Sequence, residues 1–154
     1  NVCYNIYAFY EYWKSLSMKF VVHEHHASHL HFDFRLEIEG VLKSWAVPKG
    51  PSMNPADKRL AIMVEDHDLG YGDFEGIIPD GQYGAGVVKI WDSGIFKLAG
   101  GNIKSGRMEF MLNGSKLKGM FALVKMKGKD KEWLLIKKKD DFANPSFKLV
   151  TVLS

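Results

Sequence analysis

The chain has 154 residues, of which 46% are hydrophobic and 25% charged, and its formal net charge is +3. This length suits one domain, which can bury about two thirds of the surface that its unfolded chain exposes. A single cysteine, Cys3, excludes an intrachain disulfide, and the sequence has no apolar run of the roughly 18 residues that a membrane-spanning helix needs. We therefore expect a soluble protein of the cytoplasm.

Residues 1–18 differ from the remainder of the chain. The stretch NVCYNIYAFYEYWKSLS is rich in tyrosine, has no regular hydrophobic period and precedes Met18. It lacks the basic start, apolar centre and small-residue cleavage site of a signal peptide. We interpret it as an atypical N-terminal extension, or as upstream sequence with Met18 as the native start, and expect one domain over residues 19–154.

Short apolar or alternating segments, separated by turn residues, follow Met18. They predict strands over residues 19–25, 29–40, 41–47, 59–66, 86–94, 94–101, 107–114, 121–130 and 132–141. Turns are expected at Gly40, Asp92-Ser93-Gly94, Gly100-Gly101, Asn113-Gly114 and Gly128-Lys129-Asp130. This spacing favours a mainly β protein, a compact and largely antiparallel β-barrel. Helix is expected only in one or two short pieces, at 55–59 and near Asp141.

The stretch from His23 to Glu37, HEHHASHLHFDFRLE, contains five of the six histidines of the chain. Residues two positions apart in a strand share a face. One face of this strand is polar and carries His29, His31, Asp33 and Arg35. The other face is apolar and carries Leu30, Phe32, Phe34 and Leu36.

The polar face suggests a metal site. His31 and Asp33 can reach one ion together, and His25 can be a third ligand if the chain bends near Ala27 and Ser28. Two imidazoles and one carboxylate suit Mn²⁺, Fe²⁺ or Zn²⁺ and leave positions open for water or substrate. A single His-x-His-x-Asp motif fits a solvent-facing strand equally well, but the clustering of histidines favours the metal site.

Two loops contain residues that suit phosphate binding. SWAVPKGPS places Lys49 directly after a strand, between Pro48 and Gly50. An ordinary exposed lysine in a turn explains that stretch equally well. The glycines of FEGIIPDGQYGAG would let backbone N–H groups face an anion, but tight barrel turns have the same composition. We interpret this second loop as structural.

The segment RLAIMVEDHDLGY places Arg59, Glu65 and His67 on one strand face by alternation, with Tyr71 four residues further on. These groups can clamp an anion, orient a neighbour and donate a proton, although a surface ladder has the same pattern. Only three arginines occur in the chain, and Arg35 and Arg59 share faces with the candidate metal and proton-transfer residues. A guanidinium matches phosphate oxygens in a bidentate way.

Together these segments carry a family resemblance. HEHHASHLHFDFRLEIEGVLKSWAVPKGPS, KRLAIMVEDHDLGYGDFEGIIPDGQYGAG, KLKGMFALVK and EWLLIKKKD closely resemble the phosphoesterase module of bacterial DNA ligase D and its stand-alone archaeal relatives. The resemblance implies a β-barrel enzyme that depends on Mn²⁺, with Co²⁺ or Zn²⁺ as alternative ions. Such enzymes remove a 3′-terminal ribonucleoside and then the 3′-phosphate from broken DNA, leaving a 3′-OH for ligation.

The resemblance also implies the partners and the residue roles. The partners are DNA 3′ ends at a primer-template or nicked duplex, a DNA ligase and a repair polymerase in end joining, and the enzyme is a nucleoid-associated monomer. The implied metal ligands are His25, His31 and Asp33, with His23 as an accessory residue. The implied catalytic residues are Arg35, Lys49, Arg59, Glu65, His67 and Tyr71, of which Arg35, Lys49, Arg59 and His67 bind phosphate.

This chain departs from the family pattern in three respects. His23 stands where many relatives have a glutamine, and Ser28-His29 replace a more basic pair. The N-terminal arm that assists ribonucleoside removal has no match in residues 1–18. We therefore expect strong 3′-phosphate removal and weak or absent ribonucleoside removal.

Two alternative functions remain open. A non-haem iron oxygenase would use the same two histidines and one carboxylate on a β-barrel. A non-catalytic nucleic-acid-binding barrel would explain residues 97–154, which carry 13 Lys/Arg against 5 Asp/Glu, or +8, and the tryptophans Trp45, Trp91 and Trp133. The oxygenase has less use for the surrounding cations, and the binding barrel does not explain the His-Asp-Arg strand.

Overall fold

The computed structural model describes residues 6–8 and 18–153. Its strands are β1 (Met18–His26), β2 (Leu30–Ile38), β3 (Val41–Val47), β4 (Lys58–His67), β5 (Gly76–Ile78), β6 (Gly86–Asn102), β7 (Arg107–Gly114), β8 (Lys118–Lys125) and β9 (Glu132–Lys137). A short 3-10 helix, η1 (Leu69–Asp73), follows β4. Apart from residues 6–8 and Met18, which begins β1, the expected N-terminal extension lies outside the described residues.

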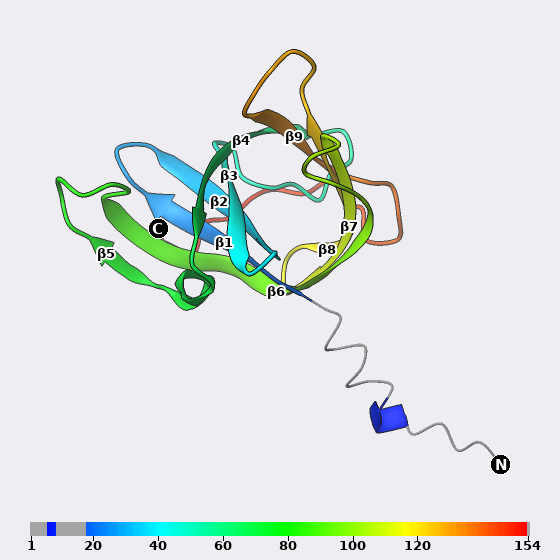
Figure 1. Ribbon diagram of the computed structural model, residues 1–154, viewed down its shortest axis with the longest axis horizontal. Coiled ribbons are helices and arrows are strands. Elements are labelled where there is room, and N and C mark those ends of the chain that lie inside the picture. The colour runs from blue at the N-terminus through cyan, green and yellow to red at the C-terminus, as the bar shows by residue number, and fades with distance from the viewer. Residues whose placement is uncertain (1–5, 9–17, 154) are drawn as a thin grey trace.

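The strands form one antiparallel sheet with the order β1-β2-β3-β4-β9-β8-β7-β6-β5. Pairing between β1 and β6 joins the two sides of this sheet and closes an eight-stranded barrel. Strand β5 pairs only with the start of β6, so it projects from the barrel with its connecting loops (Figure 1). The expectation of a mainly β, antiparallel barrel is confirmed.

Aromatic side chains fill the barrel. Phe32 and Phe34 are buried on the inner face of β2, as the alternation predicts. The Phe34 ring stacks on Phe110 with the centroids 5.9 Å apart, and Trp45 meets Trp133 edge-on at the same centroid distance. Leu30, expected on this apolar face, is instead 41% exposed, because it begins β2 beyond the packed interior.

The expected turn at Asp92-Ser93-Gly94 is wrong, because β6 runs through these residues without interruption. The Asp92 carboxylate is buried and accepts hydrogen bonds from the backbone N–H groups of Ser115, Lys116 and Leu117. The turn composition therefore reflects a carboxylate that holds the β7–β8 connection. A Cβ at Gly94 would lie 2.1 Å from the Asn113 carbonyl oxygen, so glycine allows the close approach of β7.

The expected helical pieces are also wrong. Residues 55–57 form a turn and Lys58 already begins β4, while the segment around Asp141 is a turn after β9. The short helix η1 instead follows His67, and it contains Tyr71. Its importance is positional, because it begins the segment that covers the outer face of β1–β4.

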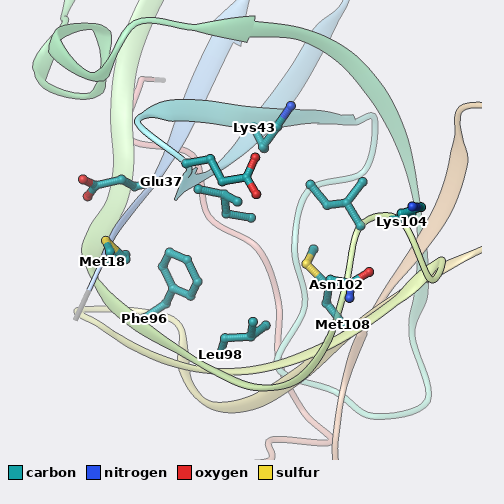
Figure 2. Close-up of a pocket in the computed structure, with 11 residues that line it drawn as sticks. Met18, Glu37, Lys43, Phe96, Leu98, Asn102, Lys104 and Met108 are labelled. Atoms are coloured by element: carbon teal, nitrogen blue, oxygen red, sulfur yellow. The ribbon is translucent and has the colours of Figure 1, made fainter. Parts of the chain in front are cut away.

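The two ends of β1 have different surroundings. Near its C-terminal end, the buried Glu24 carboxylate accepts hydrogen bonds from the backbone N–H groups of Val152 and Leu153, which fastens the C-terminal tail to the barrel. Near its start, Met18 contributes to an apolar cavity of about 780 Å³ that Phe96 and Leu98 also line (Figure 2).

Candidate active site

The candidate site lies on the outer face of β1–β4. Side chains that alternate with the buried Phe32 and Phe34 point away from the barrel interior, into a cavity of about 760 Å³. The segment from η1 through β5 to the start of β6, residues 69–86, forms the opposite wall, and we call it the flap (Figure 1). The cavity is lined by the metal-ligand candidates His25, His31 and Asp33, together with Arg35, His67 and Tyr71.

His25, His31 and Asp33 come together because β1 and β2 form a hairpin in which His25 pairs directly with His31. The Asp33 Oδ2 atom lies 3.5 Å from His25 Nδ1, and Asp33 Oδ1 lies 3.3 Å from His31 Nε2. One ligand atom from each of the three residues falls within 4.8 Å of the others. These three residues, which we call the metal cluster, can hold one metal ion, as the sequence pattern indicates.

The hydrogen bonds around the cluster fix which imidazole nitrogen faces the ion. His25 Nε2 donates to the Gly84 carbonyl oxygen at 2.7 Å, which leaves His25 Nδ1 directed at Asp33. His31 Nδ1 donates to the His29 carbonyl oxygen at 3.3 Å, which leaves His31 Nε2 directed at Asp33. Metal-binding histidines usually donate their other N–H group in this way. The residues present therefore fit a divalent ion.

The surroundings of Asp33 favour its ionised form. Burial raises its pKa, but the close contacts of its carboxylate with the His25 and His31 rings, together with the nearby Arg35 charge, outweigh this effect and lower the pKa of Asp33 well below its ordinary value. The hydrogen bond to Asp33 in turn raises the pKa of His31, although burial opposes it. An ionised carboxylate is the form that binds a cation.

Arg35 is held by neighbours on all sides. It is 2% exposed, and its Nε donates to His23 Nδ1 at 3.0 Å, while Nη1 donates to Ser44 Oγ at 2.9 Å. Its Nη2 lies 3.3 Å from Asp33 Oδ2, and its guanidinium carbon lies 5.0 Å from the centre of the Tyr71 ring. A buried cation with this many contacts is immobilised next to the metal cluster, a suitable arrangement for an anionic ligand.

His67 reaches the same cavity through an irregularity in β4. The β3–β4 register pairs Ser44 with Val64 but Leu42 with His67, so β4 contains an extra residue between these two pairs. His67 Nδ1 lies 3.1 Å from Arg35 Nη1 and 3.2 Å from the Glu65 carbonyl oxygen. Burial, followed by the Arg35 charge, lowers the pKa of His67, so this imidazole is neutral at pH 7.

Tyr71 belongs to η1 and stands over Arg35 and His67. Its ring stacks on Phe74 with the centroids 5.1 Å apart and lies 4.7 Å from the His67 ring. Burial raises the pKa of the Tyr71 hydroxyl, although the Arg35 charge opposes it, so the group keeps its proton. Tyr71 can thus donate a hydrogen bond to a ligand in the cavity.

His23 lies beneath the cavity and links Arg35 to the flap. It is 0% exposed, and its Nε2 donates to the Phe74 carbonyl oxygen at 3.1 Å while Nδ1 accepts from Arg35. Burial and the Arg35 charge lower the pKa of His23 to about 4. His23 does not belong to the cluster of metal-ligand candidates, because both ring nitrogens have other partners.

Lys49, Arg59 and Glu65 do not line the cavity. The alternation that placed Arg59 with Glu65 and His67 on one face is wrong, because Val64 faces the cavity and the extra residue of β4 shifts the phase before His67. Arg59 lies 3.5 Å from Asp57. Glu65 and Lys49 are exposed, so neither orients the cavity residues through a buried contact.

The residues that sequence reasoning missed act through uncharged groups. The carbonyl oxygens of Phe74 and Gly84 orient His23 and His25. Every residue has a backbone carbonyl, so the residue type does not indicate which ones take part. Ser44 holds Arg35, and its place on β3 opposite Arg35 becomes apparent only from the strand register.

Comparison with known proteins agrees with this geometry. A family model described as the DNA Ligase D 3′-phosphoesterase domain matches residues 23–125, which include the metal cluster, Arg35, His67 and the flap. The chain belongs to this DNA ligase D 3′-phosphoesterase domain family. The resemblance in the sequence motifs is thereby confirmed.

Curated relatives of this phosphoesterase domain are considerably longer proteins. The multifunctional non-homologous end joining protein LigD of Pseudomonas aeruginosa is 50% identical over 128 residues, which are 80% of this chain and 15% of that protein. The corresponding proteins of Mycobacterium tuberculosis and Mycolicibacterium smegmatis are 48% and 44% identical, over 71% and 79% of this chain. The chain therefore spans about 15–17% of the length of these relatives. Among the described residues, no helix has both the length and the apolar character to cross a membrane.

Proposed function

We propose that this phosphoesterase domain is a Mn²⁺-dependent enzyme that removes the 3′-phosphate from the ends of broken DNA and leaves a 3′-OH for ligation. The observation that carries the proposal is the common cavity of a three-residue metal cluster, an immobilised arginine and a neutral histidine. Membership of the DNA ligase D 3′-phosphoesterase domain family supports the substrate class. Its biological setting would be end joining inside the cell, alongside ligase and polymerase activities, as the names of the relatives suggest.

The first role is to seat the terminal phosphate. In the proposed arrangement, His25, His31 and Asp33 hold the ion, which when bound supplies Lewis-acid polarisation of a phosphate oxygen. The Arg35 guanidinium neutralises charge on the remaining oxygens. Its hydrogen bonds to His23, Ser44 and Asp33 keep it in the same position with and without bound phosphate. Positioned charge of this kind favours the transition state because it needs no reorganisation.

The second role is to handle protons at the leaving oxygen. His67 lies against Arg35, and if its Nδ1 accepts from Arg35, its Nε2 carries the proton and can donate to the phosphate or to the leaving oxygen. Tyr71, which keeps its proton, is a second donor on the same side. Water is the proposed nucleophile, because the Ser44 hydroxyl near Arg35 already donates to the Leu42 carbonyl oxygen.

Lys49, Arg59 and Glu65 receive a different role. They lie outside the cavity, so we propose that Lys49 and Arg59 attract the DNA backbone beyond the reacting phosphate, where long-range charge is sufficient. Glu65 lies next to His67 only through its backbone, with its carbonyl oxygen 3.2 Å from His67 Nδ1. Its exposed carboxylate has no contact with the cavity residues in this arrangement.

One assay tests the function. A primer-template that ends in a 3′-phosphate, and a second that ends in one ribonucleotide, are each incubated with the protein with and without Mn²⁺, and the product ends are identified. Phosphate release that requires Mn²⁺ supports the proposal, and release that EDTA does not suppress would refute the metal dependence. Tight DNA binding without turnover would favour the nucleic-acid-binding barrel, and dioxygen consumption with bound iron would favour the oxygenase.

A further inference from the structure

Tyr83 is an aromatic residue of the cavity that the proposed chemistry does not use. It belongs to the part of the flap between β5 and β6 and lines the cavity with its neighbours Gly84 and Asp80. Its side chain is 80% exposed. Over the described part of the chain, Tyr83 makes no hydrogen bond and no ring contact, so the faces of its ring are open to a ligand.

The other rings of the cavity already have partners. Tyr71 lies between Phe74 and His67, and Arg35 stands over its face. The His25 and His31 rings lie 4.6 Å apart and are themselves metal-ligand candidates. Of the two tyrosine rings that line the cavity, Tyr83 is therefore the one that is available for stacking.

The backbone fixes the position of Tyr83 relative to the metal cluster. The Gln82 N–H donates to the Pro79 carbonyl oxygen at 3.2 Å, and the Ala85 N–H donates to the Gln82 carbonyl oxygen at 3.1 Å. The next residue, Gly84, accepts the hydrogen bond of His25. Tyr83 and Arg35 line the same cavity, so the ring lies on the wall of the space into which the proposed phosphate-binding cation faces.

We propose that Tyr83 stacks on the terminal nucleobase of the DNA 3′ end and thereby distinguishes a nucleotide end from a small phosphate ester. This inference rests on the proposed function, because that function places the 3′-phosphate beside Arg35 and the metal cluster. The base of the same nucleotide is one sugar away from that phosphate, at the cavity wall where Tyr83 stands. Stacking of a base on an aromatic side chain contributes about 1–3 kcal/mol and tolerates any base, since every base has an open face.

The test compares two substrates. One is a primer-template with a normal 3′-phosphorylated terminal nucleotide, and the other has an abasic terminal nucleotide with the same 3′-phosphate. With the normal substrate, Tyr83→Ala should raise KM and the DNA dissociation constant roughly fivefold to 150-fold, with kcat nearly unchanged. With the abasic substrate, the KM and dissociation constant of wild type should rise by the same factor, and Tyr83→Ala should cause no further rise. Tyr83→Phe and Tyr83→Trp should behave as wild type.

A matched control separates stacking from general damage to the flap. Ile77 is an apolar flap residue that is 74% exposed but does not line the cavity, so Ile77→Ala should leave both substrates unaffected. An equal effect of Tyr83→Ala on the normal and abasic substrates would overturn the inference while the proposed function stands. Base-dependent DNA binding through Tyr83 without phosphate release would refute the proposed function and support the inference.

Discussion

Arg35 Nε donates a hydrogen bond to His23 Nδ1 over 3.0 Å, so the buried imidazole must accept at this nitrogen and carry its proton on Nε2. That proton points at the Phe74 carbonyl oxygen, 3.1 Å away. The network requires a neutral histidine, and burial together with Arg35 lowers the pKa of His23 to about 4. A glutamine side chain can accept and donate at the same two places.

This network predicts a pH-dependent difference in stability between wild type and His23→Gln. His23 binds a proton at about pH 6.5 in the unfolded chain and at about pH 4 in the folded protein. The contribution of neutral His23 to the free energy of unfolding, about 3 kcal/mol, is therefore fully present above pH 6.5 and is lost as the pH falls towards 4. We expect urea unfolding to show this loss in wild type relative to His23→Gln. Parallel pH profiles for the two proteins would contradict the assignment.

The metal cluster predicts the effect of single ligand removal. His25→Ala, His31→Ala and Asp33→Ala should each reduce Mn²⁺ affinity by more than about tenfold. The reason is that removing even a hydrogen-bond partner of a metal ligand typically lowers metal affinity by about that factor. Calorimetric titration measures the affinity, and circular dichroism verifies the fold. His29→Ala is the matched control, since His29 is exposed on the same strand connection and contributes only its carbonyl oxygen to His31. An equal loss in the control would show that the histidines act together without a defined site.

Arg35 and Arg59 should respond differently to replacement by lysine. Arg35→Lys keeps the charge but loses the fork that contacts His23, Ser44 and Asp33, so we expect kcat/KM for 3′-phosphate removal to fall roughly tenfold to a hundredfold. Arg59→Lys should have a smaller effect, because Arg59 pairs with Asp57 outside the cavity. Steady-state kinetics decides, and a larger loss in Arg59→Lys would place that arginine on the reacting phosphate after all.

Gly86 should be sensitive to substitution, because it joins the flap to β6 beside the β1–β2 hairpin. Its φ is +131°, and an added Cβ would lie 2.3 Å from the His26 carbonyl oxygen. Gly81, at φ +85°, has open space around it, so Gly81→Ala tests backbone strain alone. We expect Gly86→Ala to lower the free energy of unfolding by about 1 kcal/mol or more beyond Gly81→Ala. Equal decreases in the free energy of unfolding for the two variants would show that the flap accommodates the added methyl group without destabilisation.

The expected dispensability of the N-terminal segment can be tested by deletion. Residues 1–17 contain no arginine or aspartate to replace the family's N-terminal arm. We predict that their deletion leaves 3′-phosphate removal unchanged and that the intact chain removes a terminal ribonucleoside weakly or not at all. Product analysis on the ribonucleotide-ended primer measures both. Vigorous ribonucleoside release that disappears on deletion would show that this segment completes the site.

The sequence predicted the β2 face and misjudged the β4 face for one physical reason. Strict alternation assigns faces correctly along an uninterrupted ladder, and β2 pairs with both neighbours without a register shift, so His31 and Asp33 lie on the face that the pattern indicates. In β4 the register shifts before His67, which keeps His67 at the cavity but separates it from Arg59. A bulge of this kind leaves no composition signal in VEDH.

The flap could not be predicted because its contributions are backbone atoms. Gly84 is important for its carbonyl oxygen, and the loop composition is equally typical of an ordinary barrel turn. Similarly, Asp92-Ser93-Gly94 has the composition of a turn, although Asp92 acts as a buried acceptor for a different turn. Residue types suggested the chemistry that we propose for the site, whereas the support of these residues depends on contacts between distant segments.

The donor atoms of the metal cluster come from a single hairpin, between positions 25 and 33. Such closely spaced ligands remain near one another even when the barrel is unfolded, so the unfolded chain retains some capacity to chelate the same ion. Ligand binding stabilises a fold only by the difference in affinity between the folded and unfolded states. Saturating Mn²⁺ should therefore raise the melting temperature less than its affinity for the native protein alone would indicate.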